Sequence, residues 1–177
     1  MSRTIDDLLE LSRIEMGGEI LLTPIDLDDV AREAIERAQP IASRQGVSIH
    51  FDSKTAQRTI DGDYFQLVSA VSNLVDNAVK YSNEGGEVLV TTTSNGDSVE
   101  ISVQDKGIGI PMASLERIFE RFYRVDRARS RGTGGTGLGL AIVRHVVTNH
   151  GGEVNVRSRE GEGSTFLLRF PRISPSK

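Results

Sequence analysis

The spacing of apolar residues changes about halfway along the chain, and this change restricts the folds that the sequence can adopt. The first half holds three segments with apolar residues at helical spacing: residues 3–16, a segment that begins at Asp26, and a segment from Asp63 to about Tyr81. The second half alternates apolar and polar residues in the stretches around Val88 and Val99, as strands do. Such a chain needs both helices and antiparallel hairpins.

Turn signals divide the second half into two hairpins and two helices. The segment "SNGD" places Asn95 and Gly96 between two strands, a pair typical of a two-residue hairpin turn. A short helix is predicted around "MASLERIFE" and a longer one from about Leu138 to Asn149, and the last hairpin pairs "GEVNVRS" with "STFLLRF". The predicted fold is a two-layer α/β (α+β) sandwich, in which a mixed sheet packs against helices.

Size and composition exclude several classes of protein. The 177 residues suit one compact domain with a short addition, and the net charge of -4 argues against a whole-domain contact with nucleic acid. The absence of cysteine excludes disulfides and thiolate metal sites. No apolar run approaches the roughly 20 residues that span a bilayer, and the N-terminus lacks a signal-peptide pattern, so we expect a cytoplasmic chain.

The stretch "GTGGTGLGL", residues 132–140, holds five glycines directly before a predicted helix. It contains the pattern G-x-G-x-x-G at Gly132, Gly134 and Gly137, but no predicted strand precedes it, as a dinucleotide-binding fold requires. A P-loop is excluded because Leu138 stands where that motif needs lysine. Bare backbone N–H groups at a helix start can bind an anion, and a flexible surface loop is the alternative.

The stretch "NLVDNAVKYS" places three polar side chains on one side of the predicted third helix. Asn73, Asn77 and Lys80 fall within about 60° of one another at helical spacing, opposite the apolar side. An amide oxygen can bind Mg²⁺, and a lysine ammonium can neutralise a phosphate. The alternative is an ordinary solvated helix face.

The stretch "VQDKGIGIP" ends a predicted strand at Asp105 and continues through Gly107 and Gly109. An ionised carboxylate only accepts hydrogen bonds, which suits an exocyclic amine such as that of adenine. The two glycines let the backbone lie close to a planar base. A turn without any ligand is the alternative.

The order of these motifs resembles the ATP-binding domain of bacterial sensor histidine kinases, a Bergerat-type sandwich. The resemblance covers roughly residues 26–170. Four stretches are similar to the family's N box, first glycine box, F box and second glycine box, respectively "NLVDNAVKYS", "DKGIGIP", "FERFYRVD" and "GTGGTGLGLAIV". The stretch "DDLLELSRIEMGG" resembles the end of the dimerisation and phosphoacceptor domain. We therefore divide the chain into that helix end with its linker (1–25), an ATP-binding domain (26–171) and a disordered tail (172–177).

The resemblance implies roles for residues in all four boxes. The implied catalytic residues are Asn73, Lys80 and Arg124. Mg²⁺ would be held by Asn77 with support from Asn73, and adenine would be read by Asp105. The other implied ATP contacts are Tyr81, Gly107, Gly109, Ile110, Tyr123, Gly135, Thr136, Gly137, Leu138, Gly139, Leu140 and Thr165, the last acting directly or through water.

The resemblance also implies a mobile lid over the nucleotide, formed by residues 124 to about 136. The glycines at its end would let it hinge and let the helix-start amides meet the phosphates. The chain in and just before the lid is rich in arginine, at positions 121, 124, 127, 129 and 131. Only Arg124 matches a family role, and the other four are predicted to form a solvated or partner-docking surface.

Phosphoryl transfer needs an in-line acceptor, and this chain lacks the family's phosphoacceptor motif. Its histidines, His50, His145 and His150, are predicted to be packing or surface residues. The resemblance thus implies a parent protein that phosphorylates an upstream histidine and then a response regulator receiver domain. Most of this family are anchored in the membrane, with this domain inside.

Three alternatives share the fold. ATP hydrolases of the gyrase, mismatch-repair and chaperone kind carry a glutamate where this chain has Asn73, which is a much poorer base. A serine-directed kinase is disfavoured by the dimerisation-like helix at the N-terminus. A nucleotide-responsive binding module is the non-enzyme alternative. Because the N-terminal helix has only about four turns, we expect the fragment to be monomeric.

Overall fold

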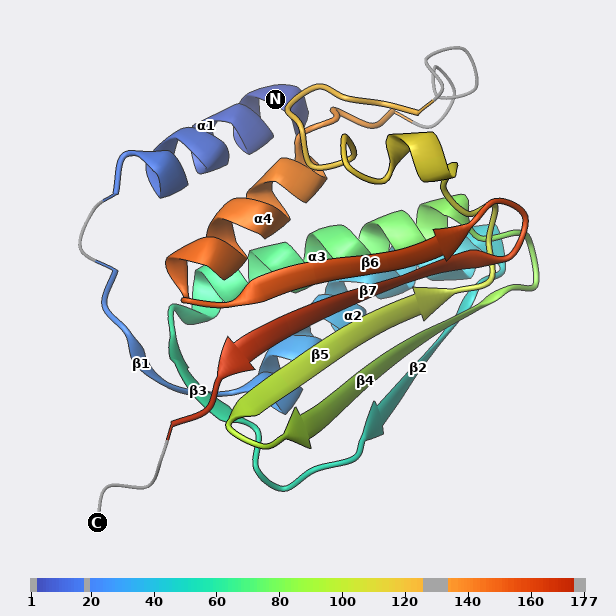
Figure 1. The fold of residues 1–177 in the computed structure, drawn as a ribbon. Coiled ribbons are helices and arrows are strands. Elements are labelled where there is room, and N and C mark those ends of the chain that lie inside the picture. Colours follow the sequence, from blue (N-terminus) through green and yellow to red (C-terminus); the bar gives the residue numbers. More distant parts are fainter. Residues whose placement is uncertain (1–2, 18–19, 126–133, 174–177) are drawn as a thin grey trace.

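The computed structural model describes residues 3–17, 20–125 and 134–173 (Figure 1). The elements in chain order are α1 (Arg3–Glu15), β1 (Thr23–Asp26), α2 (Leu27–Gln45), β2 (Ser48–Ser53), β3 (Thr59–Gly62), α3 (Tyr64–Tyr81), β4 (Glu87–Asn95), β5 (Ser98–Asp105), the 3-10 turn η1 (Met112–Ser114), α4 (Gly139–Asn149), β6 (Glu153–Arg159) and β7 (Gly163–Pro171). None of the described helices is both long enough and apolar enough to cross a membrane.

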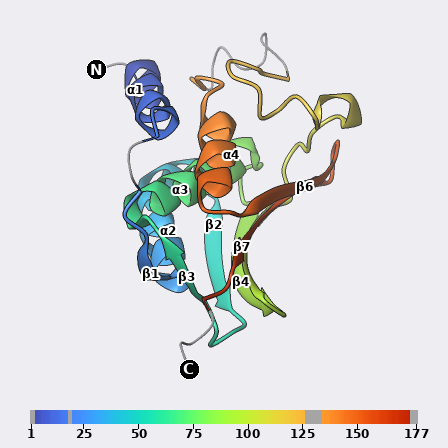
Figure 2. The same ribbon diagram turned by 60° about the vertical axis from the view of Figure 1, so that its left-hand side comes forward.

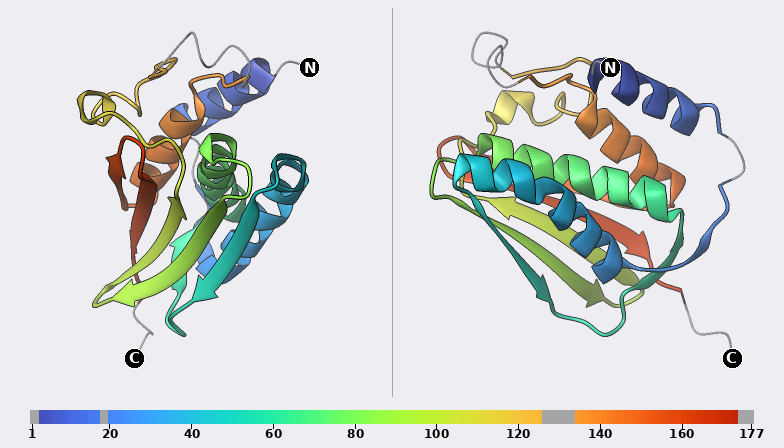
Figure 3. Two further views of the ribbon diagram at one scale, coloured as in Figure 1. Left: turned by 90° about the vertical axis from the view of Figure 1, so that its right-hand side faces the viewer. Right: turned by 180° about the vertical axis from the view of Figure 1, so that it is seen from behind.

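Five strands form one mixed sheet in the order β2-β4-β5-β7-β6. The edge strand β2 pairs with β4 in parallel, and the other neighbours are antiparallel. Helices α2, α3 and α4 cover one face of this sheet, and none of the described helices lies on the other face (Figures 2 and 3). Inward residues of the strands and the apolar sides of these helices make one core. The predicted α/β sandwich is confirmed.

Local signals place the helix ends where the sequence predicts them. The Asp26 side chain accepts the backbone N–H of Asp28 at 2.9 Å at the start of α2, and Asp63 likewise accepts that of Gln66 at 3.0 Å before α3. Gly46 ends α2 in the left-handed conformation, with φ of 65°. Helix α2 continues through Pro40 to its end.

Two elements differ from the prediction. Strands β1 and β3 form a second, two-stranded sheet, in which Ile25 lies opposite Ile60, and the sequence pattern indicated neither strand. Both are four residues long, too short for alternation to stand out. The helix predicted around "MASLERIFE" is only the turn η1, because most backbone hydrogen bonds that follow span three residues, as from Arg117 to Ser114.

Helix α1 lies on the outer side of α4 and packs against it (Figure 1). Leu11 and Ile14 are 2% and 6% exposed, and the Asn149 side chain donates to the Ile14 carbonyl at 3.4 Å. Another apolar stripe of α1 remains exposed, namely Ile5, Leu8, Leu9 and Met16. The stripe therefore does not hold α1 to the domain.

The C-terminal segment is hydrogen-bonded beyond β7. The backbone N–H of Arg172 donates to the Asp97 carbonyl at 2.8 Å. The backbone N–H of Ile173 donates to the Thr59 carbonyl at 3.4 Å. The rest of the predicted tail, residues 174–177, lies outside the described residues.

Candidate functional site

Helix α3 presents a polar face toward the start of α4. The opposite face of α3 is buried, and its residues include Leu67 and Leu74. The Asn73 amide nitrogen donates to the Ser69 carbonyl at 3.0 Å, and its Oδ1 lies against Gly139, where an added Cβ would come within 2.7 Å. Asn77, one turn later, is half-buried. The Asn73 amide and the first turn of α4 therefore meet here.

Two cations converge on the backbone of Gly135. A Cβ at this glycine would lie 2.6 Å from Lys80 Nζ and 3.6 Å from Arg124 Nη2. Lys80 Nζ is also 5.2 Å from the centroid of the Tyr81 ring. Burial raises the pKa of the Tyr81 hydroxyl, and the positive charge of Arg124 acts in the opposite direction. The structure thus brings the predicted phosphate-contacting cations together beside bare backbone.

Asp105 ends β5 with its carboxylate on the core side of the sheet. It is 7% exposed, and its Oδ1 accepts the backbone N–H of Gly107 at 2.8 Å. Burial raises the pKa of this carboxyl, while hydrogen bonds from the backbone N–H groups of Gly107 and Ser164 lower it. The raised pKa shows that burial outweighs these two bonds. A buried carboxylate with remaining acceptor capacity suits a ligand that brings its own donor.

The loop after Asp105 is fixed at both of its sides. The Ile108 N–H donates to the Tyr81 carbonyl at 3.2 Å, which ties the loop to the end of α3. The Ile110 N–H donates to Ser158 Oγ at 2.8 Å, which ties it to β6. Gly109 between them has φ of 68°, a conformation that favours glycine. The predicted glycine wall is therefore a rigid connection between helix and sheet.

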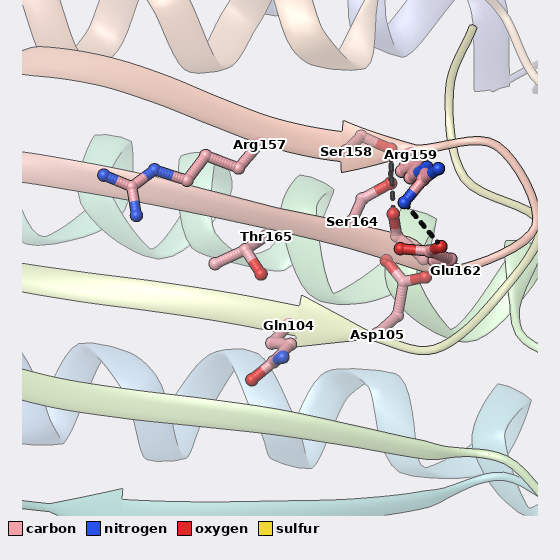
Figure 4. A pocket seen from close by; sticks show the side chains of 9 residues that line it. Gln104, Asp105, Arg157, Ser158, Arg159, Glu162, Ser164 and Thr165 are labelled. Atoms are coloured by element: carbon pink, nitrogen blue, oxygen red, sulfur yellow. Dashed lines mark hydrogen bonds and ion pairs between the residues drawn. The ribbon is translucent and has the colours of Figure 1, made fainter.

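The register of the sheet places Thr165 and Asp105 on different faces. Thr165 lies opposite Gln104, and Ser164 lies opposite Asp105. Because side chains alternate along a strand, Thr165 belongs to the outer face, which none of the described helices covers, and Ser164 to the core face with Asp105 (Figure 4). Sequence reasoning missed Ser164, and only the strand register could have distinguished the two hydroxyls.

The start of α4 is held by a hydroxyl and by a neighbouring turn. Thr136 Oγ1 accepts the Leu138 N–H at 3.2 Å and donates to Asp7 Oδ2 of α1 at 2.6 Å. The Gly137 carbonyl accepts the Phe122 N–H at 2.9 Å. Leu138 is fully buried, so it contributes a backbone group rather than a side chain to any site; Leu140 is half-buried against the core.

The Tyr123 side chain contacts Ser114 of η1 and Arg117. Its hydroxyl donates to Ser114 Oγ at 3.0 Å, and the Arg117 guanidinium lies 4.4 Å from its ring centroid. The contact of Tyr123 with the nucleotide stays a prediction. The remaining lid predictions, for Gly132 and the arginines at 127, 129 and 131, fall in residues 126–133, outside the described residues.

Two hollows lie near these residues. One, of about 300 Å³, opens on the outer face at the ends of β5, β6 and β7, and Figure 4 shows Gln104, Arg157 and Thr165 around it. The other, of about 290 Å³, lies beside Asn73 and is also lined by residues of α1 and α2, including Asp7 and Arg37. Within the described residues, no group of three or more His, Cys, Asp or Glu side chains is placed to hold a metal ion.

The sequence of this chain matches a known protein family. Residues 62–174 match the family described as histidine kinase-, DNA gyrase B-, and HSP90-like ATPases. The chain belongs to this family. The match includes α3, the Asp105 loop and α4, which carry Asn73, Lys80, Asp105 and Gly139.

Within this ATPase family, the similar proteins are sensor histidine kinases. The sensor-like histidine kinase SenX3 of Mycolicibacterium smegmatis is 48% identical over 94% of this chain and 44% of its own length. The phosphate regulon sensor protein PhoR of Pseudomonas aeruginosa is 39% identical over 96% of this chain and 38% of its own. The chain therefore spans less than half the length of these relatives. The predicted resemblance to the catalytic ATP-binding domain of sensor histidine kinases is confirmed.

A solved structure supports the same assignment. Full-length ShkA in complex with AMPPNP is 32% identical, with a TM-score of 0.83, over 98% of this chain and 36% of that chain. This ATPase-family relative was therefore solved with a nucleotide analogue.

Proposed function

We propose that this chain binds Mg-ATP between α3, the Asp105–Ile110 loop and the start of α4. We further propose that it donates the γ-phosphate to a histidine of a dimerisation domain, for relay to a response regulator receiver domain. The observation that carries the proposal is the arrangement along α3. Asp105 and its loop meet the helix at Tyr81, and the amide and cation groups around Asn73 and Lys80 meet the glycine backbone before α4.

Each end of this site has its own chemistry. Asp105 accepts a hydrogen bond from an exocyclic amine, and the wall from Gly107 to Ile110 lies against the base. Lys80 and Arg124 neutralise phosphate charge, and the first N–H groups of α4 face the same region. Asn77 offers an amide oxygen for Mg²⁺, which when bound supplies further positive charge to the phosphates. The glycine cradle fits a polyphosphate, because a Cβ at Gly135 or Gly139 would fill it.

Asn73 favours transfer to a supplied acceptor over transfer to water. Its amide nitrogen donates a hydrogen bond to the Ser69 carbonyl. An amide is also not a general base, so it does not activate a water molecule. The chain's own histidines are placed elsewhere: His50 is exposed on β2, His145 lies beside Glu15 at 3.1 Å, and His150 is buried. The acceptor histidine is therefore proposed to belong to the dimerisation domain.

The surroundings of this activity are proposed from the resemblance to sensor histidine kinases. The parent protein is anchored in the cell membrane, with this domain in the cytoplasm. Its partners are the dimerisation domain and the receiver domain, and nucleic acid is not among them. The net charge of -4 supports this last point.

Transfer of label from ATP tests the proposal. The chain is mixed with Mg²⁺, γ-labelled ATP and a separately produced phosphoacceptor domain, and Asp105→Asn serves as the variant. We expect label on the acceptor histidine with the wild type, and at least about tenfold less with the variant. Release of phosphate without an acceptor would instead indicate a hydrolase, and label on a serine would indicate a serine kinase. ATP binding without any phosphoryl transfer or phosphate release would indicate a nucleotide-responsive binding module.

A further inference from the structure

Ser158 on β6 stands at the centre of a small hydrogen-bond network behind Asp105. Its Oγ receives the Ile110 N–H at 2.8 Å, donates to the Gly163 carbonyl at 2.9 Å and lies 2.8 Å from Ser164 Oγ (Figure 4). Ser158 and Ser164 are partners in the register of β6 and β7, and Ser164 is also the partner of Asp105 on β5. One hydroxyl therefore connects the glycine wall with the strand beside the buried carboxylate.

Counting protons gives this network a direction. A serine hydroxyl has one proton and two acceptor positions. The proton of Ser158 goes to the Gly163 carbonyl, and one acceptor position takes the Ile110 N–H. All three bonds form together only if the proton of Ser164 points to Ser158. The Ser164 hydroxyl then has no proton left to donate, and it offers only acceptor positions.

We propose that Ser158 is a positioning residue that determines which purine the site accepts. This inference rests on the proposed function, since it concerns the same nucleotide. With its proton held by Ser158, Ser164 presents an acceptor beside Asp105, which is also an acceptor. A purine with a 6-amino group donates to such a pair, whereas a purine with a 6-oxo group places its own acceptor there. The site rejects the 6-oxo purine because buried acceptors would then face each other.

The same hydroxyl positions the wall of the site. Ile110 is half-buried against the core, and its N–H has Ser158 as its acceptor. Loss of the Ser158 hydroxyl removes that bond and releases the proton of Ser164. Ser164 then rotates and donates to a 6-oxo group. Removal of Ser158 should therefore change selectivity, and not affinity alone.

Binding of Mg-ATP and Mg-ITP, which differ at the 6-position, tests the proposal by calorimetry. For the wild type we expect ATP to bind more tightly than ITP. For Ser158→Ala we expect the ratio of the two affinities to fall about tenfold, as one changed hydrogen bond permits. Ser158→Thr keeps the hydroxyl and should restore the ratio. Thr165→Ala, one position beyond Ser164 on the outer face, is the matched control and should leave it unchanged.

The outcomes separate this proposal from the function on which it rests. A wild-type chain that binds neither nucleotide would overturn both. A wild-type chain that prefers ATP, together with an unchanged ratio in a folded Ser158→Ala, would overturn the role of Ser158 alone. If Ser158→Ala does not fold, Ser164→Ala replaces it, since loss of that acceptor should lower the ratio in the same way. An unchanged ratio in this second variant would also contradict the proposal.

Discussion

Among single residues, Asp105 is a buried carboxyl that we propose binds the ligand in its ionised form. Its environment raises the pKa of the carboxyl, so the group takes up a proton at a higher pH than a solvated aspartate does. The protonated form donates from one oxygen and loses part of the acceptor capacity of the ionised carboxylate. Burial therefore disfavours the ionised form, which is the form that we propose binds adenine.

The first prediction concerns the pH dependence of binding. Because the pKa is raised, we expect Mg-ATP affinity to fall as the pH is lowered through that value, beginning at a less acid pH than for a solvated aspartate. Calorimetry between about pH 7.5 and pH 5 measures this. Asp105→Asn should bind about tenfold or more weakly at neutral pH and show a flatter profile. Parallel profiles for the two proteins would show that another group titrates.

Gly139 offers a second prediction at the same scale. Gly139→Ala places a Cβ 2.7 Å from Asn73 Oδ1, so the amide must move out of its position. We expect about five- to tenfold weaker Mg-ATP binding and an unchanged fold, since alanine is well tolerated in a helix. Urea unfolding provides the control for stability.

A double-mutant cycle then identifies the cause of the weaker binding. If the alanine acts by displacing the amide, adding Gly139→Ala to Asn73→Ala should cost little more than Asn73→Ala alone. Fully additive losses would show that position 139 contributes independently of Asn73.

At the scale of elements, α1 is attached to α4 through few side chains. Leu11 and Ile14 are buried, and polar contacts join Asp7 to Thr136 and Glu15 to Arg121 and His145. Thr136 also accepts the Leu138 N–H at the start of α4. The position of α1 is therefore connected directly to the segment that we propose binds phosphate.

The third prediction tests this attachment by hydrogen exchange. Leu11→Ala removes a side chain that is 2% exposed, and we expect exchange protection of the α1 amides to fall at least about tenfold. The amides of α2 and α3 should keep their protection, because they do not depend on α1. Leu8→Ala is the matched control in the same helix, since Leu8 is 42% exposed. Equal losses in the two variants would contradict the observed docking face.

The elements also show which features can be predicted from sequence. The N-caps of α2 and α3 depend on residues two or three positions away, and the hairpin turn depends on adjacent residues, so local patterns were sufficient. The pairing of β1 with β3 places Ile25 opposite Ile60, although α2 and β2 lie between them in the sequence. A local sequence pattern cannot predict such a pairing. The choice between Ser164 and Thr165 likewise depends on register, where a shift of one residue reverses the face.

For the molecule as a whole, the apolar stripe of α1 raises the question of self-association. Ile5, Leu8 and Leu9 are exposed on a helix of 13 residues. So short an apolar stripe buries little area between two copies. The docking of Leu11 and Ile14 against α4 could not be read from the stripe, because both faces of α1 carry apolar residues.

The fourth prediction is that the chain is monomeric. Sedimentation velocity at about micromolar concentration should show one species of monomer mass, with or without Mg-ATP. Leu9→Glu changes only an exposed position and should leave the result unchanged. A tight dimer that this variant dissociates would show that the stripe of α1 is an interface.

The order of the strands also has a consequence for synthesis. β7 is the last strand along the sequence, yet it lies between β5 and β6 in the sheet. A ribosome must therefore pass residue 171 before β5 and β6 find their common neighbour. Ser164 reaches Asp105 at the same moment, so a polypeptide that ends before β7 lacks one of the two groups that we propose to contact the purine.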